Sequence, residues 1–218
     1  MNTKRLFGRA LLVLGLAMTG VQALAGGEHS NESPVMPLAN PQPVETPGKI
    51  EVIEFFWYGC PHCNKVEPTV EAWEKRLPKD VVFRREHVLW DGRSDMEGHA
   101  KLFITLRMMG LLPKHNRAVF DAVHGAKVEL RDEQVLFDWI AKRGVNRAQF
   151  EANYKSFGIG AQLGRAKQLT KAYRIEGVPT FIINGKFVSS PHQAGNEQRM
   201  FAFIDELIVR ERKAGKGQ

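Results

Sequence analysis

Blocks of apolar and polar positions divide this chain into an ordered series of predicted strands and helices. Residues 50–56 (IEVIEFF) form a nearly continuous apolar run rich in β-branched and aromatic residues, which is typical of a strand buried on both faces. Gly59 interrupts the run, and residues 60–77 are predicted to form a helix. Residues 81–90 (VVFRREHVLW) predict a second strand, so these segments form a βαβ unit with a right-handed crossover.

A block of helices follows, and no internal repeat is visible in it. Residues 94–97 (SDME) have the form of a capping box and predict a helix that runs to Met109 and ends at Gly110. Residues 132–143 begin with acids and end with bases, which is the charge order that a helix dipole favours. The remaining helices of the block are predicted at 116–124, 146–157 and 160–173.

The strand pattern returns after residue 176. Asn184 and Gly185 stand between two short apolar runs, FII and KFV, and this pattern is the strongest local signal for a hairpin with a type I′ turn. Residues 197–212 predict a last amphipathic helix. Its apolar side carries Met200, Phe201, Phe203, Ile204, Leu207 and Ile208. The order βαβ, helices, ββα predicts a mixed α/β fold.

The N-terminal segment is predicted to be removed from the mature protein. Residues 1–25 combine a basic start, an apolar run and the small-x-small site Ala23-Leu24-Ala25, which indicates a secretory signal peptide cleaved after Ala25. An uncleaved anchor is the alternative. The proline-rich residues 26–48 predict a mobile or extended arm. The basic tail at residues 213–218 is expected to fray in solvent.

Charge argues against nucleic acid as a partner. The predicted leader holds three of the 31 basic residues and none of the 24 acidic ones, which leaves 28 against 24 in the mature chain. This small excess includes no block of basic residues, so the basic character of the full chain does not indicate nucleic-acid binding.

Cys60 and Cys63 are the two cysteines of the chain, and their C-x-x-C spacing admits three interpretations. Half of a zinc site needs further ligands at a matching spacing, and the sequence has no second cysteine pair or clustered histidine pair. A structural disulfide would close a very small loop and add little stability. A redox dithiol needs one exposed, acidic thiol and a buried neighbour. The predicted helix start, with Pro61 in its first turn, places Cys60 where the helix dipole favours a thiolate, so we favour the redox interpretation.

Several motifs together resemble the thioredoxin-fold family and, within it, the DsbA-type periplasmic thiol:disulfide interchange proteins. They are FFWYGCPHC, Pro68, the GVPT turn, the ββα ending, the helical block and the export signal. The resemblance covers the chain from about Lys49. It implies a thioredoxin-like fold in two parts, 49–90 and 166–212, with an inserted α-helical domain at 91–165.

The resemblance also implies an activity. The Cys60–Cys63 disulfide would be donated to newly exported proteins in the periplasm, without a metal or any other cofactor. A DsbB-type membrane oxidase linked to quinone would be the partner, and we expect a monomer. A reductase or an isomerase of the same fold is one alternative, although isomerases usually bring a dimerisation domain. A binding or chaperone module, in which the cysteines would be dispensable, is the other.

The family pattern implies roles for residues around the dithiol. Cys60 would be attacked by the substrate and Cys63 would resolve the mixed disulfide. His62 would stabilise the Cys60 thiolate, although an exposed histidine without a role is the alternative. Val178 and Pro179 match the residue pair at which relatives have a cis peptide bond and dock an extended substrate by its main chain.

Glu54 is an anomaly, because a carboxylate on a buried strand is costly without a partner. The resemblance implies an acid that assists proton transfer at Cys63, and a strand-end residue that reaches water is the alternative. Arg84 and Arg85 are the candidate basic partners. Glu67 matches another acid of the family, but such a residue is more often solvated.

Four apolar residues in the helical block have two interpretations. Met108, Met109, Leu111 and Leu112 could line a groove for a substrate or partner, because methionine adapts to varied shapes. Packing in the core is the interpretation we favour.

Overall fold

The computed structural model describes residues 35–215, and within them a five-stranded sheet has the strand order β1-β5-β4-β2-β3. Strand β2 (Ile50–Phe56) lies inside the sheet, parallel to β3 (Val81–His87) and antiparallel to β4 (Thr180–Ile183). All seven residues of β2 are buried, which confirms the prediction of a strand covered on both faces. The predicted signal peptide, residues 1–25, lies outside the described residues.

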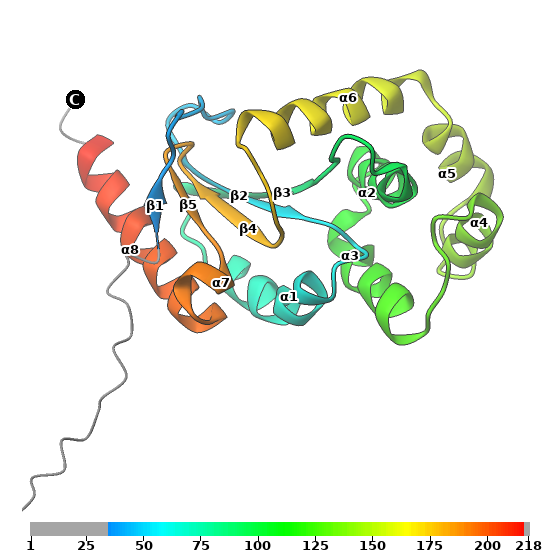
Figure 1. Ribbon diagram of the computed structural model, residues 1–218. Helices are drawn as coiled ribbons and strands as arrows, with labels where there is room; N and C mark the ends of the chain where they lie inside the picture. Colours follow the sequence, from blue (N-terminus) through cyan, green and yellow to red (C-terminus); the bar gives the residue numbers. More distant parts are fainter. Residues whose placement is uncertain (1–34, 216–218) are drawn as a thin grey trace, which may run out of the picture. The chain divides into compact units, whose positions relative to one another are not determined.

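Helices surround the sheet and extend beyond one end of it (Figure 1). Helices α1 and α8 cover one face, α6 covers the other, and α2 to α5 lie beyond the C-terminal end of β2. The helices are α1 (Pro61–Glu74), α2 (Glu97–Met108), α3 (Leu112–Phe120), α4 (Glu133–Ala141), α5 (Arg147–Tyr154), α6 (Phe157–Ala172), α7 (Pro191–Ala194) and α8 (Glu197–Gly215), with a 3-10 turn η1 (Ser94–Met96) and a π turn η2 (Asp121–Gly125).

Apolar side chains gather in three places within residues 35–215. One cluster lies between the sheet and helices α1 and α8, and includes Val52, Trp73 and Phe201. A second joins the opposite face of the sheet to α6. The third fills the helical block and reaches the end of β2, where it includes both Cys60 and Cys63. The dithiol therefore lies at the junction of the sheet and the helical block.

The predicted hairpin is present, and its turn is a point of close approach. Lys186 N–H donates to the Ile183 carbonyl, and Asn184 and Gly185 have φ of 51° and 64°, the positive values that a type I′ turn requires. A Cβ on Gly185 would lie 2.0 Å from the carbonyl oxygen of Gln42. Glycine is therefore required here both by its backbone conformation and by the arm that crosses the turn.

The part of the arm that the structure describes belongs to the sheet. Strand β1 (Met36–Pro37) pairs with β5 (Phe187–Ser189) in antiparallel register, and Leu38 N–H donates to the Lys186 carbonyl over 2.7 Å. The arm was predicted to be mobile or extended; Met36–Pro37 form an extended edge strand of the sheet, and residues 39–48 include bends and a turn. Pro37 has no N–H to offer another strand, which protects this edge.

Several helix boundaries differ from the prediction. The capping box is wrong, because Ser94 begins the 3-10 turn η1 and neither η1 nor α2 has a side-chain cap. Helix α3 begins at Leu112, before the predicted start, because Pro113 fits the first turn of a helix. Strand β3 ends at His87, since its ladder partner Phe56 is the last residue of β2.

Helix α6 links the helical block to the second half of the sheet. It begins at Phe157 rather than at the predicted residue 160, and it runs to Ala172. The predicted boundary between 91–165 and 166–212 therefore falls inside one continuous helix.

Candidate active site

The loop between β2 and α1 places the two cysteines at the start of a helix. Cys60 is the N-cap of α1 with an extended backbone (φ −84°, ψ 117°), and Pro61 occupies the first turn. The backbone N–H of Cys63 donates to the Cys60 Sγ over 3.3 Å. Both residues are free thiols, so the structure shows the dithiol form. The predicted strand, turn and helix are confirmed.

Gly59 is required by the packing of this loop. The Cys60 N–H donates to the Trp57 carbonyl over 2.9 Å, which folds the chain back before the helix. A Cβ on Gly59 would lie 2.3 Å from the indole ring of Trp57. The aromatic ring therefore fixes the path of the backbone that leads into Cys60.

The pKa values of the two thiols are shifted in opposite directions. A hydrogen bond with the Cys63 side chain is the largest effect that lowers the pKa of Cys60 to about 6, and the backbone N–H groups of Cys63 and His62 and the charge of His62 act in the same direction against burial. Burial raises the pKa of Cys63 well above its ordinary value, and the bond with Cys60 adds to this effect. At neutral pH this arrangement holds a Cys60 thiolate beside a protonated Cys63.

Cys60 is less exposed to solvent than the sequence analysis predicted. Cys63 is fully buried, as predicted, but Cys60 is only 6% exposed rather than open to solvent. The reason is the turn before β4, whose Val178 carbonyl oxygen lies 3.5 Å from the Cys60 Sγ. The turn therefore covers part of the Cys60 sulfur.

The neighbours of the cysteines in the first turn of α1 face solvent. Pro61 and His62 are both exposed. His62 also lines the cleft beside the dithiol. Its backbone N–H and its charge both lower the pKa of Cys60, and a role for His62 in the reaction stays a prediction.

The turn at Val178 and Pro179 faces the dithiol. The peptide bond between them is cis, as the family pattern implied. Thr180 Oγ1 donates to the Gly177 carbonyl over 2.7 Å and closes the turn. The Cys60 thiol donates to the Val178 carbonyl, so this oxygen is the main-chain group nearest the reactive sulfur in the turn.

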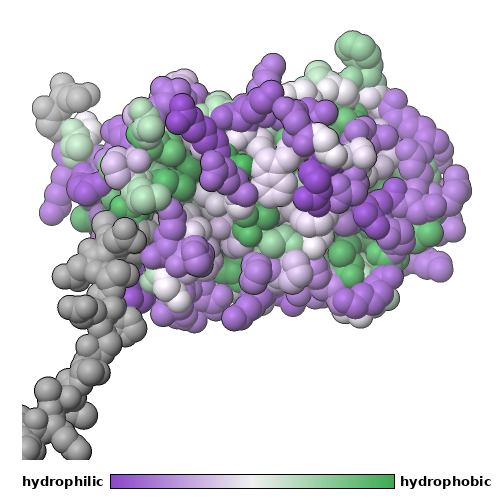
Figure 2. Space-filling view, in the orientation of Figure 1, coloured by the Kyte–Doolittle hydropathy of each residue, from purple (hydrophilic) through white to green (hydrophobic). Residues whose placement is uncertain are grey.

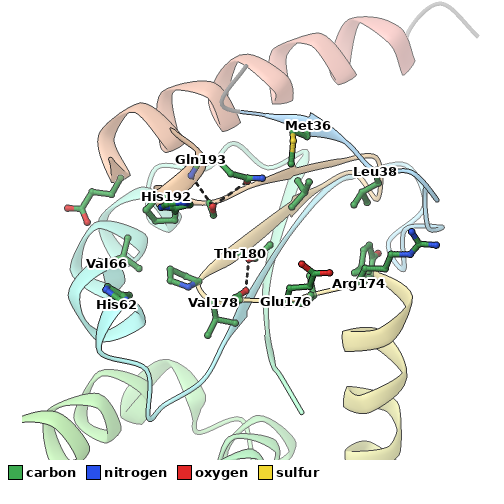
Figure 3. A pocket seen from close by; sticks show the side chains of 18 of the residues that line it. Met36, Leu38, His62, Val66, Arg174, Glu176, Val178, Thr180, His192 and Gln193 are labelled. Atoms are coloured by element: carbon green, nitrogen blue, oxygen red, sulfur yellow. Dashed lines mark hydrogen bonds between the residues drawn. The ribbon is translucent and has the colours of Figure 1, made fainter. Parts of the chain in front are cut away.

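A cleft of about 1090 Å³ runs along this turn. Figure 3 shows His62 and Val66 of α1 on one side of it and Val178 and Thr180 at the turn. In Figure 2, hydrophobic surface lies where the turn before β4 is seen in Figure 1, and polar side chains surround it. The cleft therefore lies beside the dithiol, between the start of α1 and the turn at Val178.

Glu54 lies behind the dithiol with Arg85 as its partner. The carboxylate is fully buried, and its Oε2 lies 3.2 Å from the Nε of Arg85. The residues are opposite each other in the ladder between β2 and β3, so their side chains share one face of the sheet. Arg84 points to the other face and pairs with Glu51 at 3.1 Å. The alternative that Glu54 reaches water is therefore wrong.

Glu67 is part of the same buried cluster, so the expectation that it is solvated is wrong. It is 1% exposed, and its Oε1 accepts from Arg85 Nη2 over 3.1 Å and from Asn116 Nδ2 over 2.7 Å. Tyr58 O–H donates to Asn116 Oδ1 over 2.7 Å. The sequence analysis missed Asn116 and Tyr58. The one signal for Tyr58 was its place beside the dithiol, and Asn116 had none.

Burial controls the protonation of the acids in this cluster. It raises the pKa of Glu54 to about 7, although the charge of Arg85 opposes the shift. Burial also raises the pKa of Glu67 to about 8, and the negative charge of Glu54 adds to that effect. The charge of the Cys60 thiolate raises the pKa of Glu54 further, so the thiol and the acid influence each other. Glu54 can therefore take up or release a proton near neutral pH.

The four apolar residues of the helical block do not reach this cleft. Met109, Leu111 and Leu112 pack partly against the core of the block, and Met108 is 48% exposed. None of them is among the described residues that line the cleft beside the dithiol. Three of the four thus contact the core, as we favoured, and all four also line two other clefts, so their role in binding a partner stays a prediction.

Residues 35–215 contain neither a cluster of potential metal ligands nor a helix suited to span a membrane. In this range no group of three or more histidine, cysteine or acidic side chains could hold a metal ion. Among the helices of the same residues, none combines the length and the apolar composition that a bilayer crossing requires.

Comparison with known proteins identifies relatives over most of the chain. A family profile described as "DSBA-like thioredoxin domain" matches residues 51–206. The thiol:disulfide interchange protein DsbA of Pseudomonas aeruginosa is 39% identical over 204 residues, which cover 94% of this chain and 93% of that protein. DsbA of Burkholderia cepacia is 40% identical over 206 residues, which cover 94% of this chain and 96% of the relative.

Solved structures give the same relationship. The crystal structure of Pseudomonas aeruginosa DsbA is similar with a TM-score of 0.79 and 40% sequence identity, over 84% of this chain and 94% of the other. The oxidoreductase NmDsbA1 of Neisseria meningitidis is similar with a TM-score of 0.72 and 31% identity, over 84% of this chain and 93% of its own.

Proposed function

This chain belongs to the family of DSBA-like thioredoxin domains and is a thiol:disulfide oxidoreductase that introduces disulfide bonds, and from this premise we propose which residues carry the reaction and where it takes place. Its fold is thioredoxin-like with an α-helical insertion, as the sequence analysis predicted. The proposal assigns Cys60, Cys63, Pro61, His62 and Glu54 to the reaction, and Val178 and Pro179 to substrate binding.

The reaction begins from the oxidised enzyme. A substrate thiolate attacks the Cys60 Sγ, a bond forms between these two sulfurs, and the Cys60–Cys63 bond breaks. The electron pair goes to the Cys63 sulfur, which takes up a proton because its thiolate is disfavoured by burial. Glu54 can supply this proton, since its pKa lies near 7 and the negative charge of Glu54 is felt at Cys63.

A second substrate thiolate completes the transfer. It attacks the substrate sulfur of the mixed disulfide, forms the new substrate disulfide and releases Cys60 as a thiolate. The low pKa of Cys60, about 6, makes this sulfur a good leaving group. Pro61 places the helix start, and His62 and the backbone N–H groups hold the released charge. The substrate loses two electrons, which the dithiol form of the enzyme now carries.

The surroundings of Cys60 also support an oxidising enzyme over a reductase. A fold that stabilises the Cys60 thiolate stabilises the reduced protein, and so favours transfer of the disulfide to another molecule. The acidic Cys60 at the start of α1, where the Cys63 N–H donates to its sulfur, is the observation that carries this proposal. The Cys60–Cys63 pair itself carries the electrons, and no further cofactor is required.

The location and partners complete the proposal. Residues 1–25 would direct the chain to the periplasm and be removed after Ala25, and newly exported proteins would be the substrates. A DsbB-type membrane oxidase linked to quinone would remove the two electrons and restore the disulfide. The protein would act as a monomer.

Equilibration with glutathione tests the proposal. The protein is incubated with mixtures of reduced and oxidised glutathione, and the fraction of Cys60–Cys63 disulfide is read after acid quenching and alkylation. We expect the couple to be more oxidising than that of thioredoxin, about −270 mV. A potential at or below that of thioredoxin would instead identify a reductase. A parallel assay of disulfide formation in a reduced, unfolded protein should show catalysis by the wild type and none by Cys60→Ser.

A further inference from the structure

The cleft beside the dithiol has a second lobe, and the N-terminal arm forms its wall. Met36 and Leu38 of the arm line it together with Val188 of β5, and Arg174 and Glu176 stand at its rim. We call these five residues the arm lobe. Figure 3 shows Met36 and Leu38 on the far side of the cleft from the start of α1.

Strand register places the arm lobe on the α6 side of the sheet. Met36 is directly opposite Val188 in the ladder of β1 and β5, and residues directly opposite each other share one face. Val188 and Leu38 pack against the apolar cluster between the sheet and α6. Val66, next to the dithiol, belongs to the cluster on the opposite face. The cleft therefore has one lobe on each face, and the turn at Val178 joins them.

The arm lobe offers an apolar contact to solvent. Among the large apolar side chains that are exposed within residues 35–215, Met36 alone lines this cleft, and it is 48% exposed. A methionine has a flexible, polarisable side chain that can fit many apolar partners. Arg174 and Glu176 carry opposite charges, so together they favour neither a positive nor a negative ligand. The lobe thus fits an apolar side chain of variable shape.

We propose that the arm lobe is a second subsite for polypeptide substrates, and that it holds an apolar side chain near the cysteine that reacts with Cys60. The inference rests on the proposed function, because the lobe is continuous with the turn that faces the reactive thiol. The occupant is a substrate chain that is not yet folded, since such a chain still exposes the apolar residues that folding would bury.

Paired peptides test this subsite. Each peptide has two cysteines, and the members of a pair differ only in a leucine or a serine at one position about two to six residues from the attacked cysteine. The rate constant for reduction of the oxidised enzyme is measured for both members. We expect the ratio of the leucine rate to the serine rate to exceed one at a particular position, and Met36→Ser to lower this ratio about fivefold there.

Two further variants make the test specific. Met36→Leu restores an apolar side chain and should keep most of the preference. Met108→Ser is the matched control, because Met108 has the same exposed fraction, 48%, but lies on α2 outside the cleft, and its ratio should equal that of the wild type. A ratio of one at every position, an unchanged ratio in Met36→Ser, or an equal loss in Met108→Ser would each overturn the subsite.

The outcomes also separate this inference from the proposed function. If the wild type oxidised neither peptide of any pair, the proposed function would be wrong. If it oxidised both without regard to Met36, only the subsite would be wrong. Light scattering on the same samples measures the oligomeric state. If the wild type were a dimer and Met36→Ser a monomer, the occupant of the arm lobe would be a second copy of the chain, and the substrate subsite would be wrong.

Discussion

The carbonyl oxygen of Val178 accepts a hydrogen bond from the Cys60 thiol at 3.5 Å, across 118 residues of sequence. The contact brings the turn before β4 to the start of α1, beside the Cys60 sulfur. We therefore expect a polypeptide joined to Cys60 to lie against Val178 and Pro179.

Replacement of Pro179 should slow the release of substrate. Proline has a fixed φ and no N–H, so Pro179→Thr adds a donor and frees the backbone where the substrate docks. We expect mixed disulfides between Cys60 and cellular proteins to accumulate, visible as thiol-sensitive bands on a non-reducing gel. Pro191→Thr is the control, because Pro191 lines the same cleft at the start of α7. If Pro179→Thr turned over normally and trapped no protein, Pro179 would have only a structural role in the turn.

Cys60 should react with alkylating reagents far faster than Cys63. At pH 6 about half of Cys60 is a thiolate, while the buried Cys63 remains protonated, so we expect a rate ratio of about 100 or more for iodoacetamide, measured by peptide mapping. Cys63→Ala removes the side chain that bonds to Cys60 and should move the pH midpoint of Cys60 labelling upward. Equal labelling of the two residues would reverse the roles assigned to them.

The reduced protein should gain stability over the oxidised protein as the pH rises. The pKa of Cys60 is lowered from its ordinary value of 9.0 to about 6. The stability that the thiolate adds to the reduced protein is therefore complete above pH 9, declines as the pH falls and is lost below pH 6. The oxidised protein has no such titration. We expect the difference in unfolding free energy to grow by at most about 1.4 kcal/mol per pH unit across this window.

Guanidinium unfolding of both forms at pH 5, 6, 7 and 8 measures this difference. At pH 8 the reduced form should be the more stable, since the small disulfide loop adds only about 2 kcal/mol to the oxidised form. A difference that does not change with pH would contradict the assigned pKa of Cys60.

The stability of Glu54→Gln relative to that of the wild type should increase as the pH rises. The pKa of Glu54 is raised from 4.5 to about 7, so the folded state holds a proton that the unfolded state has lost, and wild-type stability falls between these pH values. The amide has no such titration, so the variant should gain about 1–3 kcal/mol relative to wild type between pH 4.5 and pH 7.5.

The matched control for this effect is Glu51→Gln. Glu51 is equally buried on the same strand, but it accepts hydrogen bonds from Arg84, so its replacement should destabilise the protein at neutral pH. Glu54→Gln should also slow reduction of the disulfide near neutral pH, because it cannot donate a proton to Cys63. If both variants showed the same pH dependence, Glu54 would not be the titrating acid.

Replacement of His62 should remove only part of the stabilisation of the Cys60 thiolate. The bond with the Cys63 side chain is the largest cause of the low pKa of Cys60, and the charge of His62 is a smaller one. His62→Ser should therefore raise the pKa of Cys60 by less than about one unit, measured by thiolate absorbance at 240 nm, and make the couple less oxidising. His192→Ser is the control, because His192 is also exposed in the cleft. If neither the pKa of Cys60 nor the redox potential changed in His62→Ser, His62 would have no role in the reaction.

The sequence alone determined the local elements and the reactive pair. The apolar run at β2, the Pro61 helix start after Gly59 and the turn at Asn184 and Gly185 are set by interactions between residues that are close in the chain. The cysteine spacing belongs to the same class, because three residues of helix place both sulfurs together wherever the helix lies. These features could be predicted without knowledge of the rest of the fold.

The surroundings of the dithiol depend on contacts between distant segments and could not be predicted from local sequence. Arg84 and Arg85 are neighbours with the same charge, and the ladder with β2 decides which of them faces Glu54, since a shift of one residue would exchange their faces. Glu67 is polar and lies on a helix, so its burial depends on packing by Arg85 and Asn116 from distant elements. The contact of Val178 with Cys60 and the pairing of the arm with β5 likewise join distant segments, whose positions depend on how the whole core packs.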